Sequence, residues 1–214
     1  MELRVNEMFF SIQGESTFAG YPCIFVRLAG CNLKCTYCDT EYARDTGTWM
    51  SLEEICGKVS AFDFHMVEIT GGEPLLQHGT PALVSRLLSE GFTVLLETNG
   101  SRDIGPLDRA CVKIVDMKCP GSGQAGFMDM QNIHRMDAKD QLKFVLTDRA
   151  DYDYAKNMLN HIRQAGNESP VLFSPVAGGL APESLSSWIL ADRLPVRLQL
   201  QLHKIIWPMA VSGV

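Results

Sequence analysis

The sequence predicts an α/β fold in which about six parallel strands form a partial, TIM-like barrel with few crossover helices. Two observations support this prediction: short β-rich runs alternate with helical patterns, and nearly every predicted strand ends in a glycine or a reactive polar side chain. Barrel enzymes build their sites at the carboxyl ends of the strands. About six strands are too few for a complete eight-stranded barrel, so we expect an open one, in a single domain of residues 1–214.

Composition narrows the class of protein. Hydrophobic residues make up 46% of the 214 residues, which is enough for one sizeable core. The net charge is −6 and Lys and Arg form no block, so we expect no nucleic-acid surface. The N-terminus has no signal-peptide core and no run reaches transmembrane length, so we expect no membrane association. Seven cysteines without a targeting segment indicate a reducing, cytoplasmic compartment.

The first predicted strand covers residues 24–28. A capping box follows, in which Ser51 and Glu54 can each satisfy a backbone amide at the start of a helix. The next strand covers residues 66–69. Thr80, which a proline follows, then opens a helix with an apolar face formed by Leu83, Leu87 and Leu88.

Five further β-rich runs predict strands at residues 93–96, 112–115, 142–146, 171–173 and 196–200. Between them, Asp151 is expected to cap a helix whose apolar residues recur at helical spacing, namely Tyr154, Met158, Leu159 and Ile162. Pro182 is expected to begin another, with Leu185, Trp188 and Ile189. Residues 121–131 are rich in glycine and weakly patterned, so we expect a long loop there.

The most specific signal is the C-x3-C-x2-C run of Cys31, Cys35 and Cys38, directly after the first predicted strand. Three thiolates on one loop can converge on one metal centre, but they are one short of the four that complete a [4Fe–4S] cluster or a structural zinc site. An open coordination position allows chemistry at the metal, so we expect a [4Fe–4S] cluster with three Cys ligands and an open iron. A disulfide is disfavoured, and a zinc site would need a fourth ligand. The other cysteines form no second C-x2-C pair: Cys23, Cys56, Cys111 and Cys119.

A second motif, Gly71-Gly72-Glu73-Pro74, follows the second predicted strand. Alone it would be an ordinary turn. Together with the cysteines, it resembles the radical S-adenosylmethionine (SAM) superfamily, in which this segment meets the methionine amino group of SAM. The resemblance implies a radical SAM core, SAM bound at the open iron, and a 5′-deoxyadenosyl radical after one-electron reduction. It places Gly72 and Glu73 at the cofactor.

Within that superfamily, nearly the whole chain resembles the 7-carboxy-7-deazaguanine synthase family. The segments that carry the resemblance are NEMF (6–9), IQGE (12–15), FVRL (25–28), CDT (38–40), ETNG (97–100), DMKCPGSG (116–123) and QLHKIIW (201–207). It implies a carbon–nitrogen lyase that contracts the ring of 6-carboxy-5,6,7,8-tetrahydropterin, with Mg²⁺ and loss of ammonia, in queuosine-type deazapurine biosynthesis. A flavodoxin-like electron donor and a homodimer are also implied.

The resemblance assigns residues by position. The pterin would be held by Ile12, Gln13, Gly14, Arg27 and Thr70. Mg²⁺ would be held by Thr40. SAM would contact Gly72, Asp116, Met117, Lys118 and the segment from Ser174. Tyr37 would pack against adenine, or else only shield the cluster.

Several residues keep a second interpretation. Arg27 stands in an apolar strand and needs a partner, which would be either Glu68 in an ion pair or the substrate carboxylate held by the guanidinium fork. Asp116 and Lys118 could form a surface ion pair. His203 remains unassigned. Ser16 stands where the family commonly has glycine, and residues 209–214 extend a chain whose relatives can place their C-terminus near the substrate.

Parts of the sequence also match three other functions. Residues 121–126 match G-x-G-x-x-G, with Asp140 near the position of the acidic residue, so a dinucleotide-binding enzyme is one alternative. A zinc-binding module is another. A glycyl-radical activating enzyme has the same cysteine spacing but needs a protein partner.

Overall fold

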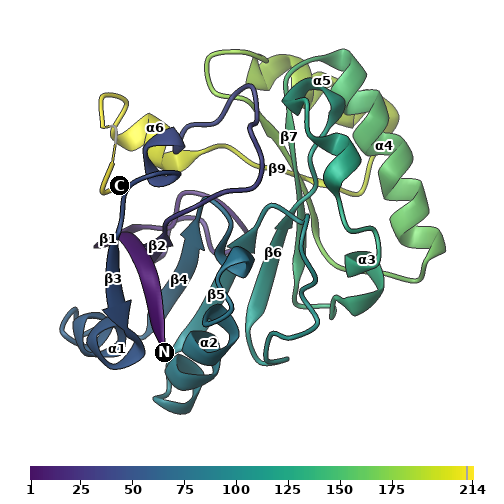
Figure 1. The fold of residues 1–214 in the computed structure, drawn as a ribbon. Helices are drawn as coiled ribbons and strands as arrows, with labels where there is room; N and C mark the ends of the chain where they lie inside the picture. The colour runs from purple at the N-terminus through teal and green to yellow at the C-terminus, as the bar shows by residue number, and fades with distance from the viewer. Residues whose placement is uncertain (211) are drawn as a thin grey trace.

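One nine-stranded sheet organises the chain, in the order β3-β1-β2-β4-β5-β6-β7-β8-β9 (Figure 1). The structure is a computed structural model and describes residues 1–210 and 212–214. Its parallel strands are β2 (Pro22–Leu28), β4 (Met66–Gly71), β5 (Thr93–Thr98), β6 (Val112–Asp116), β7 (Gln141–Leu146), β8 (Val171–Pro175) and β9 (Arg197–Leu198). Across the described residues the edge strands β3 and β9 do not pair, so the sheet is open and the predicted partial α/β barrel is confirmed.

Two antiparallel strands escape prediction from the sequence. β1 (Glu2–Ile12) pairs antiparallel with β2 and with β3 (Thr48–Ser51). Most β1 side chains are half-buried, and the register shifts between Val5 and Glu7. The strand therefore lacks the strict apolar–polar alternation by which a half-buried strand is recognised.

Few helices cover the sheet. They are α1 (Leu52–Ser60), α2 (Thr80–Ser89), α3 (Asn132–Arg135), α4 (Arg149–Gln164), α5 (Pro182–Asp192) and α6 (Leu202–Ile206), with 3-10 turns η1 (Glu41–Ala43), η2 (Pro74–Leu76), η3 (Pro120–Ser122) and η4 (Ala125–Phe127). The capping box of α1 and the prolines that open α2 and α5 are confirmed. The long crossover from β6 to β7 contains only 3-10 turns and the four-residue α3.

One predicted cap is wrong. Asp148, and not Asp151, is the N-cap of α4, and its side chain accepts from the Asp151 backbone N–H at 2.9 Å. The Asp151 carboxylate instead accepts from the backbone N–H groups of Gly121 (2.7 Å) and Thr147 (2.9 Å). Asp151 therefore ties the loop after β6 to the start of α4.

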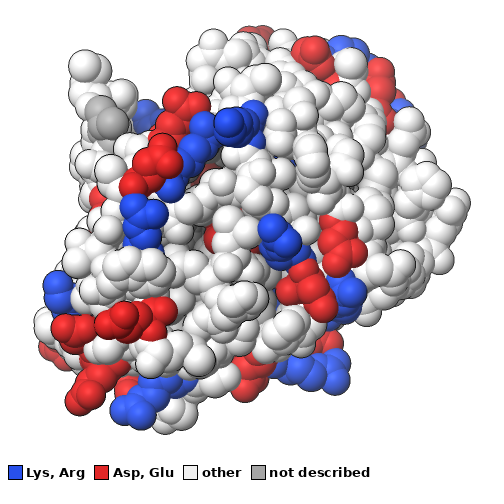
Figure 2. Space-filling view, in the orientation of Figure 1, with Lys and Arg blue, Asp and Glu red and all other residues white. Residues whose placement is uncertain are grey.

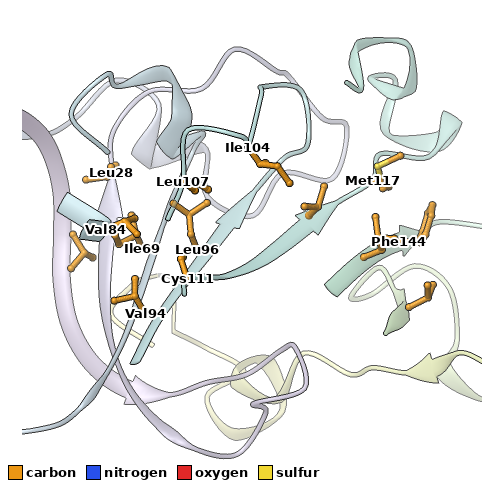
Figure 3. Packing of buried hydrophobic residues seen from close by; sticks show 14 of the residues in the cluster. Leu28, Ile69, Val84, Val94, Leu96, Ile104, Leu107, Cys111, Met117 and Phe144 are labelled. Atoms are coloured by element: carbon orange, nitrogen blue, oxygen red, sulfur yellow. The ribbon is translucent and has the colours of Figure 1, made fainter. Parts of the chain in front are cut away.

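Alternation along the central strands separates the core from the inside of the barrel. In β4, Val67 and Ile69 are buried in the main hydrophobic core, and Figure 3 shows Ile69 beside Val84 of α2. Because successive strand residues point to opposite faces, Glu68 and Thr70 face a cavity on the other side. In β5, Val94 and Leu96 are likewise in the core, and Glu97 lines the cavity. Polar residues within apolar strands therefore line the inside of the barrel.

The surface shows two further features. No helix in the described part of the chain is long and apolar enough to cross a membrane. On the face shown in Figure 2, acidic and basic side chains are interspersed. Charges of both signs therefore lie close together on this face and partly cancel each other's field at a distance.

Candidate active site

A cavity of about 430 Å³ lies inside the open barrel and brings together most of the predicted site residues. Those that line it are Ile12, Gln13, Gly14, Arg27, Cys31, Cys35, Tyr37, Cys38, Thr40, Thr70, Gly72, Asp116 and Lys118. Three predicted residues do not line it: Glu73, Met117 and Ser174.

The cysteine loop follows the end of β2. Cys31, Cys35 and Cys38 are partly exposed to the cavity, whereas the other four cysteines are buried. The Leu33 backbone N–H (3.5 Å) and the Asn99 side-chain amide (3.8 Å) donate to the Cys31 sulfur. These two contacts fix the position of the Cys31 sulfur at the cavity.

The arrangement of the thiols fits a cluster better than a single ion. Among the residues described, no three His, Cys, Asp or Glu side chains lie close enough together to hold one metal ion. The cysteines of an iron–sulfur cluster bind different irons and need not converge on one point. The cysteine loop therefore fits the predicted cluster and disfavours the zinc alternative.

Gly72 allows the cysteine loop to lie directly against the end of β4. A Cβ atom on residue 72 would overlap the Gly30 carbonyl oxygen and lie 2.7 Å from the Cys31 Cβ. Any side chain here would separate the two motifs. The backbone at residue 72 is thus presented to the cavity beside the cysteines.

Glu73 holds two loops together. Its side chain is fully buried, and its carboxylate accepts from the Thr98 hydroxyl (2.9 Å) and from the backbone N–H groups of Asn99 (2.7 Å) and Leu75 (2.9 Å). These bonds fix the loop after β5 against the Gly-Gly-Glu-Pro turn. Glu73 therefore acts on the cavity by positioning its neighbours.

The end of β6 places a charged pair at the cavity. Lys118 Nζ donates to Asp116 Oδ2 at 2.7 Å, and only 10% of each side chain is exposed, so the pair is buried and not superficial. Asp116 Oδ1 is buried without a hydrogen-bond partner in the described residues. Such an atom indicates a missing polar partner, which fits contact with a bound cofactor. The Met117 side chain is packed in the core, so only its backbone can contribute.

Tyr37 and Ser174 lie along the neighbouring strands. The Tyr37 hydroxyl donates to the Val145 carbonyl at 3.4 Å, and the Lys118 Nζ lies 5.9 Å from the Tyr37 ring centroid. Ser174 of β8 is in register with Val145 of β7. Its hydroxyl is a second buried polar atom for which the described chain offers no partner.

Arg27 pairs with Glu7, and the expected alternative partner, Glu68, is wrong. Arg27 Nε lies 2.7 Å from Glu7 Oε1, which also accepts from the Tyr42 hydroxyl at 2.8 Å. The guanidinium lies 5.7 Å from the Phe9 ring centroid and 6.0 Å from that of Tyr42. None of the contacts in the described residues engages its two terminal nitrogens. Arg27 is thus held by one edge, and its terminal NH₂ groups remain free for a ligand.

An acidic group around Lys143 completes the cavity and was not predicted. Lys143 Nζ lies 2.7 Å from Glu15 Oε2 and 3.6 Å from Asp116 Oδ2, and it also donates to Glu97. Glu68 lies nearby on β4 and accepts from the Gln13 side-chain amide. The cavity therefore contains four carboxylates and two buried lysines, Lys143 and Lys118.

Burial and Lys143 set the pKa values of this group in opposite directions. Burial alone would raise the pKa of Glu15, but Lys143 and a hydrogen bond from Gln201 lower it to about 2. Burial raises the pKa of Glu97 despite Lys143. Burial, and then the neighbouring Glu97, raise the pKa of Glu68 well above its ordinary value. Although burial opposes it, the surrounding carboxylates raise the pKa of Lys143 and keep it charged.

A sequence signal for the missed residues does exist. Glu68 stands between Val67 and Ile69, and Lys143 lies between two apolar neighbours in β7. A charged side chain in the middle of a buried strand needs a partner or a function. The sequence does not show that these residues, far apart in the chain, meet in one cavity.

Helix α6 closes the cavity beside residue 14. The Leu202 backbone N–H donates to the Gly14 carbonyl at 2.9 Å, and a Cβ on residue 14 would overlap the His203 imidazole, so this approach requires glycine. Burial lowers the pKa of His203, so the ring is neutral at pH 7. Lys204 Nζ lies 2.6 Å from Asp39 Oδ2, which connects the helix to the cysteine loop.

The two departures from the family pattern have structural counterparts. Ser16 has φ 64°, in the left-handed region that favours glycine, which explains why a glycine suits this position. Val214, at the end of the C-terminal segment, lines the cavity. Residue 211 of that segment lies outside the described residues.

Comparisons with known proteins agree with this geometry. The model of the Radical SAM superfamily matches residues 25–121. A 7-carboxy-7-deazaguanine synthase of Chlorobaculum tepidum is 46% identical over 99% of this chain and 97% of the relative. One of Koribacter versatilis is 42% identical over 99% and 100%. The crystal structure of QueE from Escherichia coli superposes with a TM-score of 0.77 at 23% identity, over 94% of each chain, and so supports the fold.

Proposed function

The chain belongs to the 7-carboxy-7-deazaguanine synthase family of the radical SAM superfamily, and we propose that it converts 6-carboxy-5,6,7,8-tetrahydropterin to 7-carboxy-7-deazaguanine with loss of ammonia. This makes it a radical SAM lyase of queuosine-type deazapurine biosynthesis. The observation that carries the proposal is a single cavity shared by the cysteine loop, Arg27 and Thr70. A metal-binding loop and a carboxylate-binding group in one cavity suit a small acidic substrate.

The residues present fit the two cofactors. Cys31, Cys35 and Cys38 would hold the [4Fe–4S] cluster. When bound, the cluster and SAM supply the 5′-deoxyadenosyl radical that takes hydrogen from the substrate. The protein orients these groups and excludes water. We assign SAM to the Gly72 backbone and to the side chains of Asp116, Lys118 and Tyr37, which line the cavity. Met117, Ser174 and Glu73 do not line the cavity, so we assign them backbone or indirect roles.

The other side of the cavity would hold the pterin. Arg27 can receive the substrate carboxylate in its free fork, with Thr70 in register beside it on β4. The segment Ile12, Gln13 and Gly14 would contact the ring. We assign Mg²⁺ to Thr40, whose hydroxyl lies 3.9 Å from the Cys38 sulfur at the cavity. Mg²⁺ takes few protein oxygens and accepts substrate oxygens for the rest, so one threonine suits it.

The proposal extends to the setting of the reaction. One continuous sheet supports a single domain over residues 1–214. Free thiols at all seven cysteines support a reducing, cytoplasmic compartment. The partly exposed cysteine loop suits reduction by a flavodoxin-like donor. A homodimer rests on the family resemblance.

The geometry disfavours the alternatives. Residues 121–126 would need to open a helix to bind a dinucleotide. Instead, Gly123 caps the end of η3 in a left-handed conformation, and residues 125–127 form the 3-10 turn η4. A glycyl-radical activating enzyme must admit a protein segment, whereas His203 and Val214 line this cavity together with Arg27. A cavity lined by these residues suits a small-molecule substrate.

Product analysis tests the proposal. The protein is reconstituted anaerobically with iron and sulfide and given SAM, reductant, Mg²⁺ and the carboxytetrahydropterin. We expect 7-carboxy-7-deazaguanine and ammonia in equal amounts, and no product when SAM is omitted. A reconstituted enzyme that cleaves SAM but leaves the pterin unchanged would contradict the proposed substrate.

A further inference from the structure

Glu68 is a buried carboxylate that the reaction as proposed above does not use. It lies on β4, is 3% exposed and lines the cavity. Arg27 of β2 is in register with Thr70, whereas Phe25 is in register with Glu68. Glu68 therefore shares a face of β4 with Thr70 but lies two residues further from the cysteine loop.

The contacts of Glu68 hold it in place and leave one oxygen free. The Gln13 side-chain amide donates to Glu68 Oε2, and the oxygen of that amide accepts from the Glu15 backbone N–H at 2.9 Å. The amide is thus fixed from both ends. Glu68 Oε1 makes no hydrogen bond to any described residue and is not sealed from the cavity.

No cation of the described residues forms an ion pair with Glu68, although Lys143 and Arg27 lie near enough to act on its charge. Lys143 pairs with Glu15, Glu97 and Asp116. Arg27 pairs with Glu7, and Lys118 pairs with Asp116. A buried carboxylate without a direct ion-pair partner is costly unless N–H donors surround it. The side chain is therefore suited to a ligand that brings N–H groups.

We propose that Glu68 binds the N–H edge of the substrate's aminopyrimidinone ring and thereby selects pterins over ring systems without the amino group. This inference rests on the function proposed above. Two residues along a strand span about 6.6 Å, which is comparable to two fused six-membered rings. A pterin whose carboxylate lies beside Arg27 and Thr70 therefore reaches Glu68 with its opposite edge.

The charges fix the direction in which such a substrate enters. Glu15, whose pKa is lowered to about 2, is ionised and repels the substrate's own carboxylate, which leaves Arg27 as its place. The amino group and ring N–H of the pterin lie side by side and match the two oxygens of a carboxylate, as the guanidinium fork of arginine does. Each carboxylate oxygen has two lone pairs, so Oε2 can serve Gln13 and the ring together.

The first test compares holoenzymes that carry Glu68→Gln or the matched control Glu53→Gln, which is exposed at the start of α1. Glutamine keeps the shape of Glu68 but replaces one of its two acceptor oxygens with an NH₂ donor. The KM for the carboxytetrahydropterin should rise about tenfold or more, with kcat nearly unchanged because the ring contact is equal in ground and transition states. The control should match wild type, and iron content and SAM binding should be normal in both variants.

The second test measures selectivity directly. Binding of 6-carboxypterin and of 6-carboxylumazine, in which oxygen replaces the amino group, is followed by fluorescence titration of the holoenzyme. Wild type should prefer the carboxypterin by about tenfold, and Glu68→Gln should largely lose this preference.

Two results would overturn the role of Glu68: a Glu68→Gln enzyme with unchanged KM and preference, or a wild-type enzyme with no preference. Failure of the proposed function looks different. The wild-type enzyme would then form no 7-carboxy-7-deazaguanine at all, which removes the substrate on which this inference depends.

Discussion

Lys143 is the cation that compensates three of the carboxylates in the cavity, and replacing it tests the electrostatics of the site. Lys143→Met keeps the length of the side chain and removes its charge. Glu15 and Glu97 would then remain buried without their shared partner, whereas Asp116 would keep its pair with Lys118. Removing one partner of a buried ion pair costs about 3–5 kcal/mol. We expect the free energy of unfolding at pH 7 to fall by about that amount.

The pH dependence supplies an internal check. Burial would raise the pKa of Glu15, but Lys143 outweighs it and lowers the pKa from 4.5 to about 2. A change of one in pKa corresponds to about 1.4 kcal/mol, so this lowering corresponds to a few kcal/mol of stability. A carboxyl group whose pKa is lower in the fold stabilises it above its ordinary pKa, and the contribution is lost as the pH falls towards the folded value. The difference between wild type and Lys143→Met should therefore shrink between pH 4.5 and 2.

Urea unfolding of the metal-free proteins, followed by tryptophan fluorescence at pH 7 and at about pH 3, measures both effects. Lys58→Met, exposed on α1, is the control and should change stability by no more than about 0.5 kcal/mol. A cost below about 1 kcal/mol at pH 7, which is typical of a surface ion pair, would refute the reasoning. An equal cost at both pH values would also refute it.

Two further predictions concern the cofactor and substrate sides of the cavity. The variants Cys31→Ala, Cys35→Ala and Cys38→Ala should each lose iron and activity, whereas the control Cys56→Ser, in the core, should keep the cluster. Iron analysis after anaerobic reconstitution measures this, and the opposite pattern would exclude these three cysteines as the cluster ligands. Arg27→Lys keeps the charge but loses the fork, so substrate binding should weaken by about tenfold or more while SAM binding stays intact; unchanged substrate affinity in the folded variant would exclude this role.

Local sequence patterns predict the parallel part of the fold well. Apolar runs bounded by Gly, Pro and polar residues give β4 to β8, and the capping box and Pro182 give the starts of α1 and α5. β1 escapes because its partners lie on both sides in an antiparallel arrangement, and its half-buried side chains follow no strict period. For α4, two aspartates compete for the cap, and only the contact of Asp151 with Gly121 decides between them.

The candidate site likewise has one part that the sequence predicts and one part that it does not. The cysteine loop and the Gly-Gly-Glu-Pro turn are compact motifs, so the sequence alone predicts them. The acidic group is not compact, since Lys143 is 128 residues from Glu15 and 46 from Glu97. Each member looks like an isolated charge in an apolar strand. Their meeting depends on the curvature of the sheet and on the antiparallel β1, neither of which has a local signature.

The transfer of hydrogen from the pterin to SAM tests most directly whether the two occupy one cavity. The carboxytetrahydropterin is labelled with deuterium at the carbon that bears the carboxylate and is turned over by the reconstituted enzyme. If Arg27 and Thr70 hold that carbon beside SAM, deuterium should appear in recovered SAM as product forms. Deoxyadenosine should then not accumulate in step with product. Product formed without any deuterium in SAM, or with one deoxyadenosine released per product, would contradict this account.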